Sequence, residues 1–266
     1  MVPKLFDTRR RVVMRRYQSC HVKTKLYQLL KKSPARYLYQ RIKALRGGAG
    51  QSDEAEILAG LAVDCPKTFI EFGFHPTQYN CIGLRDFSGL LIDGDAETVR
   101  LARRLLPQRL EVRQQFINLA NVESIAHHHH ELGVLSIDVD GNDYWFLQAL
   151  LATRPHVICV EYNASLGHAP LTVPYDPVFE RHAKHPSGWY HGASLSALAK
   201  LCRQQDYKLV AVARGGGNAF FVRATSTVTA LEPAQAYREL KLRNHWSGTT
   251  AAEQWACIKH LPFVTV

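Results

Sequence analysis

Four polar side chains follow two apolar stretches of the sequence, at a spacing that could support catalysis or metal binding. Asp138 and Asp140 end one stretch, and Glu161 and Asn163 end the next. Side chains two residues apart in an extended chain point to the same side, so both pairs would face one rim if the stretches are neighbouring strands. Oxygen ligands gathered in this way could hold Mg²⁺ or another divalent cation, or one acid could act as a general base on a hydroxyl.

The segment that begins at Asp138 resembles a calcium loop only in composition. An EF-hand needs glycine at its sixth position and a bidentate glutamate at its twelfth, whereas Gly141 is fourth here and Ala149 is twelfth. Asn142 or Asp143 can instead cap a helix that begins directly afterwards.

Two further acids stand at the spacing of a nucleoside site. Glu71 precedes Gly73, and Asp93 follows twenty residues after that glycine, again at the end of an apolar run. An acid at the end of a second strand can accept hydrogen bonds from both ribose hydroxyls of a bound nucleoside. The alternative for either acid is a helix cap or plain exposure at a strand end.

Short apolar runs alternate with helical patterns from about residue 67, which is typical of βαβ units. Strands are predicted at 68–72, 90–93, 110–116, 134–138, 157–161, 208–212 and 218–222, and helices after Pro76 and at 96–106, 122–126, 142–152 and 193–205. The turn at 215–217 is too short for a crossover, so the last two strands must pair antiparallel. The sequence therefore predicts an α/β, Rossmann-like, seven-stranded, mostly parallel sheet with a C-terminal antiparallel hairpin.

The segments 69–73 (FIEFG), 91–95 (LIDGD) and 135–141 (LSIDVDG) resemble successive motifs of the FkbM-like class I S-adenosylmethionine-dependent methyltransferases. The resemblance covers residues 67–223 and implies methylation of oxygen, often on sugars or natural-product scaffolds. It implies that Glu71 and Gly73 flank the methionine moiety, that Asp93 holds the ribose, and that Asp138 faces the sulfonium and the substrate. The implied cofactor-binding set is Glu71, Gly73, Phe74, Asp93, Gly94, Phe116, Asn118 and Asp138. Gly73 stands alone where many methyltransferases have a G-x-G run.

Three further residues are candidates for the acceptor side. Tyr190 and His191 end an irregular stretch, 163–191, and would lie over the cleft, where they could contact substrate or transfer a proton. Asn218 opens the last strand and is either a turn residue or part of the acceptor pocket. The proposed catalytic residues are thus Asp138, Asp140, Glu161 and His191, the substrate-binding residues Asn163, Tyr190 and Asn218, and the metal ligands, if a metal binds, Asp138, Asp140, Glu161 and Asn163.

The run 127–130 (HHHH) is better explained as a solvated loop, because four consecutive side chains cannot face one ion.

Charge divides the chain at its N-terminal end. Residues 1–46 hold fourteen Lys and Arg and one acid, so they carry +13 of a total net charge of +10, and the remainder carries −3. We expect three regions: a basic amphipathic helical arm with a glycine-rich linker (1–50), an S-adenosylmethionine-binding domain (51–223) and a helical tail packed on it (224–266). The arm could attract nucleic acid or an anionic membrane, or target an organelle. It could equally be a solvated basic helix.

The sequence contains no apolar run long enough to span a membrane and no apolar signal segment, so we expect a cytoplasmic or membrane-peripheral protein. Three functions compete. The first is O-methylation of a sugar, glycan or small molecule, and the second is RNA methylation anchored by the arm. The third is a non-catalytic binding protein on the same scaffold. The absence of an Asn/Asp-Pro-Pro-Tyr/Phe pattern after the fourth strand disfavours the second, and the retained acids disfavour the third.

Overall fold

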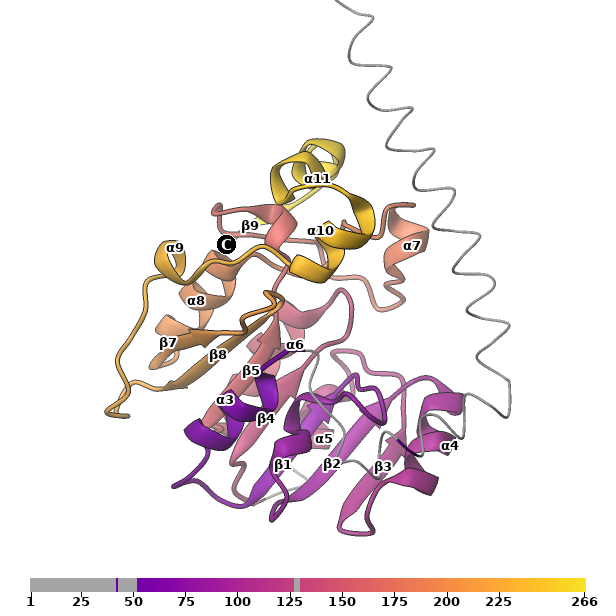
Figure 1. Cartoon of the computed structure of the whole chain (residues 1–266), viewed down its shortest axis with the longest axis vertical. Helices are drawn as coiled ribbons and strands as arrows, with labels where there is room; N and C mark the ends of the chain where they lie inside the picture. Colours follow the sequence, from indigo (N-terminus) through magenta and orange to yellow (C-terminus); the bar gives the residue numbers. More distant parts are fainter. Residues whose placement is uncertain (1–41, 43–51, 127–129) are drawn as a thin grey trace, which may run out of the picture.

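A seven-stranded sheet forms the centre of the computed structural model, which describes residues 42, 52–126 and 130–266 (Figure 1). The strands lie in the order β3 (Leu110–Gln114), β2 (Ser88–Asp93), β1 (Thr68–Phe72), β4 (Val134–Ile137), β5 (Val157–Glu161), β8 (Asn218–Arg223) and β7 (Tyr207–Val212). Strands β1 to β5 are parallel, and β8 pairs antiparallel with both β5 and β7. This arrangement confirms the predicted Rossmann-like class I methyltransferase fold.

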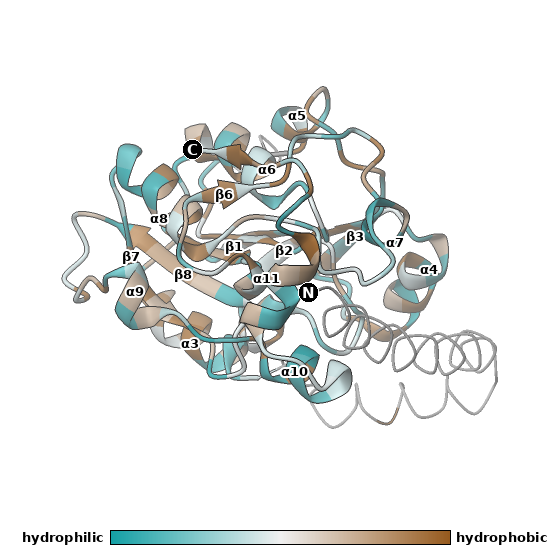
Figure 2. Ribbon diagram, turned by 90° about the horizontal axis from the view of Figure 1, so that it is seen from above, coloured by the Kyte–Doolittle hydropathy of each residue, from teal (hydrophilic) through white to brown (hydrophobic). Residues whose placement is uncertain are grey.

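Helices cover both faces of the sheet and bury two hydrophobic cores. One face carries α5 (Val122–Ala126), α6 (Asp143–Leu150), which continues into η2 (Leu151–Thr153), and α8 (Leu195–Gln204), and the other carries α3 (Glu54–Leu61) and α4 (Ala96–Leu105). Strand residues alternate between these cores, as Phe69 and Ile70 do, and each such fully buried side chain contributes roughly 1.5–3 kcal/mol to folding. Seen from above, hydrophobic strands lie between helices that carry hydrophilic residues (Figure 2).

The helix expected after Pro76 is a correction to the sequence analysis, because the structure has only the 3₁₀ turn η1 (Asn80–Gly83) there. The preceding helix α3 occupies the adjacent space. A Cβ at Gly83 would lie 2.7 Å from the carbonyl oxygen of Ala55, so η1 and α3 touch through their backbones. The short turn η1 thus packs directly against α3.

The stretch 163–191 and the C-terminal tail fold against each other. The stretch contains η3 (Ala164–Leu166), β6 (Leu171–Thr172) and α7 (Arg181–Lys184), and the tail contains α9 (Pro233–Ala236), α10 (Lys241–Ser247), α11 (Ala251–Ile258) and β9 (Val264–Thr265). Strand β9 pairs with β6, and a third hydrophobic cluster joins the two segments through Trp189, Tyr190 and Ile258. Figure 1 shows α7, α10 and α11 gathered at one end of the sheet.

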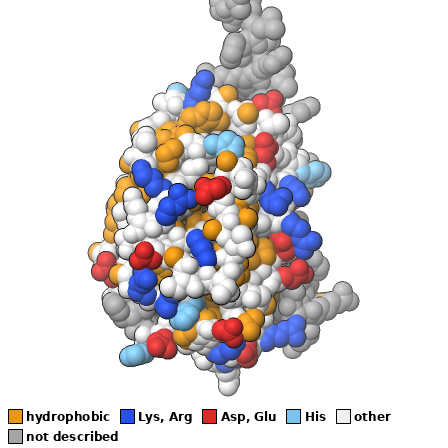
Figure 3. All heavy atoms as spheres, turned by 90° about the vertical axis from the view of Figure 1, so that its left-hand side faces the viewer, with side chains coloured by type: hydrophobic (Ala, Val, Ile, Leu, Met, Phe, Trp, Pro, Cys, Tyr) orange, Lys and Arg blue, Asp and Glu red, His pale blue; other side chains and the backbone are white. Residues whose placement is uncertain are grey.

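The predicted basic arm and the histidine run lie outside the described residues, apart from Ile42 and His130. On the face shown in Figure 3, acidic and basic side chains are interspersed, without a single-sign patch. Within the described part of the chain, no helix is both long enough and apolar enough to cross a membrane.

Candidate active site at the carboxyl ends of the strands

The loop after β1 lies directly against the end of β4. Gly73 has φ +72°, and a Cβ at this residue would lie 1.7 Å from the carbonyl oxygen of Asp138. Only glycine allows this approach, because it has no Cβ and adopts positive φ readily. The contact falls where the strand order reverses between β1 and β4, which is where open parallel sheets bind ligands.

Asp93 and Phe116 lie beside this point and could together hold a nucleoside. The Asp93 carboxylate accepts the backbone N–H groups of Asp95 at 2.7 Å and of Phe74 at 3.4 Å, and burial raises its pKa. A Cβ at Gly94 would lie 3.3 Å from the Phe116 ring, which is 60% exposed because β3 ends two residues before it, earlier than predicted. An acid that can accept hydroxyl hydrogens thus stands next to an open aromatic face.

Two of the proposed cofactor-binding residues accept hydrogen bonds from backbone N–H groups of the protein itself. Glu71 is buried, and its carboxylate oxygens accept the backbone N–H groups of Asn80 at 2.8 Å and Cys81 at 2.9 Å. Its carboxylate is therefore bound by the first two N–H groups of η1, which corrects its assignment to the methionine moiety. Burial raises the pKa of Glu71 to about 7. The Asn118 side-chain oxygen accepts the backbone N–H of Ala120 within the turn before α5.

A cluster of acids follows β4. Asp143 accepts the backbone N–H groups of Val139 at 2.9 Å and Gly141 at 3.0 Å, so it folds the chain back on itself, and burial raises its pKa to about 6. Asp140 has φ +60°, an unfavourable conformation for a residue with a side chain, of the kind that clusters at functional sites. Burial and the neighbouring Glu161 raise the pKa of Asp138 well above its usual range. Asn142 stands at the N-cap position of α6, but its side chain bonds the backbone of Asp176 and makes no cap hydrogen bond.

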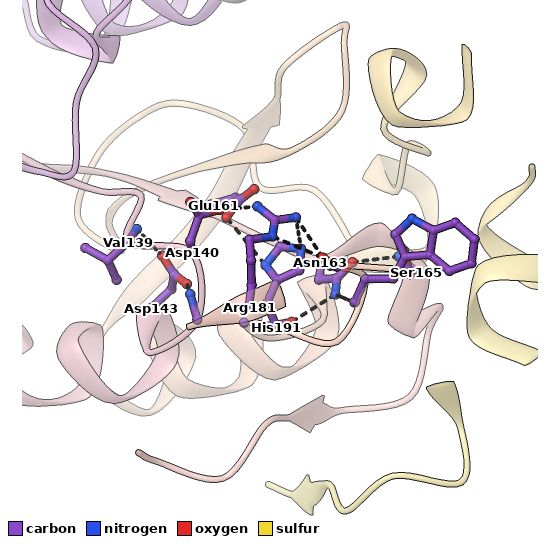
Figure 4. Close-up of polar contacts among 12 residues, drawn as sticks. Val139, Asp140, Asp143, Glu161, Asn163, Ser165, Arg181 and His191 are labelled. Atoms are coloured by element: carbon purple, nitrogen blue, oxygen red, sulfur yellow. Dashed lines mark hydrogen bonds and ion pairs between the residues drawn. The ribbon is translucent and has the colours of Figure 1, made fainter. Parts of the chain in front are cut away.

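Glu161 and His191 face each other in this cluster. Glu161 Oε2 lies 3.7 Å from Nδ1 of His191, and neither atom has a hydrogen-bond partner among the described residues. Burial raises the pKa of Glu161 to about 8, assisted by Asp140 and Asp143. Burial, Arg181 and Arg243 hold the pKa of His191 well below its usual value, so this histidine is neutral. Figure 4 shows the Glu161, Arg181 and His191 side chains pointing toward one another.

Two arginines that the sequence analysis missed reach the same histidine. Arg181, from α7, pairs with Asp140 and donates to Gly188 O, and its Nη2 lies 3.1 Å from His191 Nε2. Arg243, from α10, places Nη2 2.8 Å from the same nitrogen. Neither belongs to a motif: each is one of many basic residues, and nothing local marks it as part of a site. Burial and Arg181 lower the pKa of Arg243 to about 10, which leaves it charged near neutral pH.

The arrangement does not fit the proposed divalent cation. Asp140, Glu161 and His191 offer ligand atoms within 4.8 Å of one another, but the Arg181 guanidinium already binds the Asp140 carboxylate and His191. Asn163, the fourth proposed ligand, takes no part. Its Oδ1 accepts from Ser165 N and Arg243 Nη1, and its Nδ2 donates to Trp189 O and His191 O. The cation at this position is a guanidinium.

The three proposed substrate-binding residues lie elsewhere or face other partners. Asn163 is buried and fully bonded, as described above. Tyr190 is buried in the third cluster, where its hydroxyl donates to Pro262 O and its ring stacks edge-on against Phe263 at 5.1 Å. Asn218 pairs with Glu161 across β5 and β8, but its side chain is buried against Glu54 of α3. The substrate assignments of Asn163 and Tyr190 are therefore corrected, and Asn218 is a neighbour of Glu161 that faces α3.

No protein-family model and no curated protein sequence matches the chain. Among solved structures, the chain is similar to the O-methyltransferase from Bacillus cereus in complex with SAH, at 15% identity over 76% of this chain and 95% of that one, with a TM-score of 0.46. It is similar to the N-terminal domain of EvdMO1 in the presence of SAH and D-fucose, at 10% identity over 73% and 97% of the two chains, with a TM-score of 0.41. It is also similar to the pre-rRNA processing protein fibrillarin of Methanococcus jannaschii, at 9% identity over 59% and 66%, with a TM-score of 0.39.

Proposed function

We propose that the protein is an S-adenosylmethionine-dependent methyltransferase that methylates a hydroxyl group of a sugar, glycan or small-molecule acceptor. One observation carries the proposal: a nucleoside-type site and a cluster of buried acids meet at the strand-order reversal of a methyltransferase-type sheet. Asp93 and Phe116 would take the ribose and the adenine, and Gly73 lets the backbone approach the methionine end. Membership of the FkbM-like branch is part of the proposal and rests on the motifs at 69–73, 91–95 and 135–141.

The acid cluster supports a cationic ligand. Burial and mutual repulsion raise the pKa values of Asp138 and Glu161, which means that the folded chain leaves their negative charges incompletely compensated. A sulfonium beside them would supply the missing positive charge. When bound, S-adenosylmethionine supplies a methyl group: the acceptor oxygen forms the new C–O bond, the S–C bond electrons pass to sulfur, and the hydroxyl proton leaves to a base.

Glu161 is the residue best placed to be that base. Its pKa of about 8 lies near the working pH of most enzymes, which is the condition for efficient general-base catalysis. Its side chain is 13% exposed, and its Oε2, although buried, has no hydrogen-bond partner among the described residues. Asp138 lies between the two halves of the site and would face the reacting groups of both.

The proposed partner of residues 1–46 is an anionic surface, either a membrane or a nucleic acid, since this segment carries +13. RNA is the alternative acceptor that this charge favours. Removing residues 1–46 should leave affinity for S-adenosylhomocysteine unchanged and abolish binding to anionic vesicles or to RNA, whichever the full chain binds. Unchanged binding to both would show that the segment has another role.

Two experiments test the function. The full chain is incubated with methyl-labelled S-adenosylmethionine and a cell extract divided into glycan, small-molecule and RNA fractions, and label should enter one of the first two. Calorimetry with S-adenosylhomocysteine should show binding that weakens about 100-fold in Asp93→Ala, because charge-assisted hydrogen bonds to the ribose are lost. Asp95→Asn is the matched control, because Asp95 caps α4 by accepting from Thr98 N and asparagine can do the same. Absence of binding by the intact chain would refute the assignment.

A further inference from the structure

We propose that Glu161 and His191 together bind one acceptor hydroxyl, and we call this pair of side chains the cradle. Arg181 and Arg243 hold the His191 proton on Nδ1, so that His191 donates to the hydroxyl and Glu161 accepts from it. The identity of the hydroxyl as the methyl acceptor rests on the proposed function. The tautomer of His191 does not, because it follows from the geometry of the chain alone. The two parts of the inference can therefore fail separately.

The tautomer follows from the kinds of groups that meet at Nε2. Arg181 Nη2 lies 3.1 Å from this nitrogen and Arg243 Nη2 lies 2.8 Å from it. A guanidinium has donors and no acceptor, so Nε2 must offer its lone pair to both. A neutral imidazole with an unprotonated Nε2 carries its hydrogen on Nδ1. The doubly protonated form would place the Nε2–H against two cations, which agrees with the lowered pKa of His191.

Nδ1 of His191 faces the Glu161 carboxylate without bonding to it. Glu161 Oε2 lies 3.7 Å from Nδ1, too far for a direct hydrogen bond, and both atoms are buried without a hydrogen-bond partner among the described residues. Buried polar atoms that stay unpaired cost about 1–3 kcal/mol each, so two that face each other indicate a missing third group. An oxygen at about 2.8 Å from each can satisfy both.

The third group must accept from Nδ1–H and donate to the Glu161 carboxylate, and a hydroxyl does both. Its oxygen has two lone pairs: one accepts from His191, and the other stays available for attack while the proton moves to Glu161. A neutral amine nitrogen has a single lone pair, and the hydrogen bond from His191 would occupy it. The cradle therefore favours oxygen over nitrogen as the nucleophile.

Both arginines are themselves held by other partners, which makes them positioning residues. Arg243 Nη1 donates to Asn163 Oδ1 at 2.7 Å and to Ser165 Oγ at 3.0 Å. Arg181 is held by Asp140 and by two bonds to Gly188 O. Each guanidinium is thus oriented before it meets His191, and the planar fork of arginine is what allows these separate contacts. Lysine at either position could keep the charge but not the full set of bonds.

The first test reads the tautomer directly, in the full chain without cofactor or acceptor. Nitrogen-15 NMR, with the His191 signal identified by its loss in His191→Gln, should show a neutral ring protonated on Nδ1 at neutral pH. In the double variant Arg181→Gln/Arg243→Gln, the His191 pKa should rise by at least one unit. Arg203→Gln is the control, because Arg203 is an exposed ion-paired arginine remote from the site, and it should change nothing. A ring protonated on Nε2, or one that titrates near pH 6.5 in the intact chain, would overturn the inference.

The second test concerns the hydroxyl and uses the fraction that accepts label from S-adenosylmethionine. The labelled methyl should be found on oxygen. Arg243→Lys should lower the rate of transfer at least tenfold with S-adenosylhomocysteine affinity unchanged, and should lose the single His191 tautomer in the NMR experiment. Label on nitrogen, or Arg243→Lys with a normal rate and an altered tautomer, would refute the cradle while leaving the methyltransferase assignment intact.

Discussion

The two halves of the site are built in different ways. On the cofactor side, Asp93 is bound by the backbone of its neighbour Asp95 and of the adjoining loop, and the Phe116 ring is exposed. On the acceptor side, Glu161 and His191 are enclosed by Arg181 from α7 and Arg243 from the tail, groups that lie up to 80 residues from their partners in the chain. The cofactor side is a property of the sheet and its first loops, whereas the acceptor side exists only when the distant segments dock.

The largest expected effect tests whether Glu161 is the chemical centre of the acceptor side. Glu161→Gln keeps the shape of the side chain but removes the base, so turnover should fall by about 100-fold or more, with affinity for S-adenosylhomocysteine changed less than threefold. In the intact enzyme kcat/KM should rise with pH through a midpoint near 8 and level off above it, because the pKa of Glu161 is raised to about 8. A rate assay over pH with labelled cofactor and the accepting fraction measures both.

Asp140→Asn is the matched acidic control for that experiment. The Asp140 side chain is 59% exposed and pairs with Arg181, so it acts on the site through that arginine and should lower turnover less than Glu161→Gln does. If Asp140→Asn lowered turnover more than Glu161→Gln, the exposed Asp140 would be the base.

Much of the fold could be predicted from the sequence because its signals are local. A strand that ends on an acid, a glycine at the close approach of two loops and an antiparallel final hairpin each follow from a few consecutive residues, and strands β1 and β5 have the predicted ends. Glu71 shows the limit of this reasoning. Its position at a strand end was visible, but its side chain turned out to bind the backbone of η1, an element that replaced the predicted helix.

Only part of the acceptor side could be predicted. The sequence names Asp140, Glu161 and His191 as candidates, and these side chains lie together, but it does not show how neighbouring residues divide between the site and the core. Tyr190 and His191 are adjacent in the chain, yet Tyr190 enters a hydrophobic cluster with the tail and His191 enters the acid cluster. Which of the two faces the cleft depends on where the tail docks. The expected alternation of side chains also fails at Asp140. Its positive φ ends the extended backbone on which that alternation depends.

The second prediction concerns stability and uses the raised pKa of Glu161. A carboxyl whose pKa is raised in the folded state stabilises the protein fully below its unfolded value, about 4.5, and loses that contribution as pH rises through its folded value, about 8. Glutamine does not titrate. Glu161→Gln should therefore gain stability over the intact protein between pH 5 and pH 9, on the order of 2–4 kcal/mol. Urea unfolding at several pH values measures the difference, and a constant difference across this range would contradict the raised pKa.

A smaller effect is expected from loosening the tail without touching the acid cluster. Gln254 of α11 is buried: its Oε1 accepts from Ser165 Oγ at 2.5 Å, and its Nε2 donates to Asn244 Oδ1 at 2.8 Å. Gln254→Ala removes the acceptor of the Ser165 hydroxyl hydrogen and the donor to Asn244 Oδ1, so the free energy of unfolding should fall by about 1–3 kcal/mol. The rate of transfer should fall with it, because Ser165 also holds Arg243, while S-adenosylhomocysteine affinity should be preserved. If S-adenosylhomocysteine affinity fell as much as the rate of transfer, the two halves of the site would fold as one unit.

The smallest effect is expected at Tyr190, which is next to His191 in the chain but packs in the third hydrophobic cluster. Its hydroxyl donates to Pro262 O, and its ring belongs to the third hydrophobic cluster. Tyr190→Phe removes one hydrogen bond and keeps the ring against Phe263, so unfolding should become easier by about 1 kcal/mol, with turnover and cofactor affinity within twofold of the intact protein. Denaturant unfolding and the labelled-transfer assay on the same preparation provide both numbers. A tenfold loss of turnover at unchanged stability would show that Tyr190 contacts the acceptor. Tyr190 would then belong to the acceptor side of the site as well as to the third hydrophobic cluster.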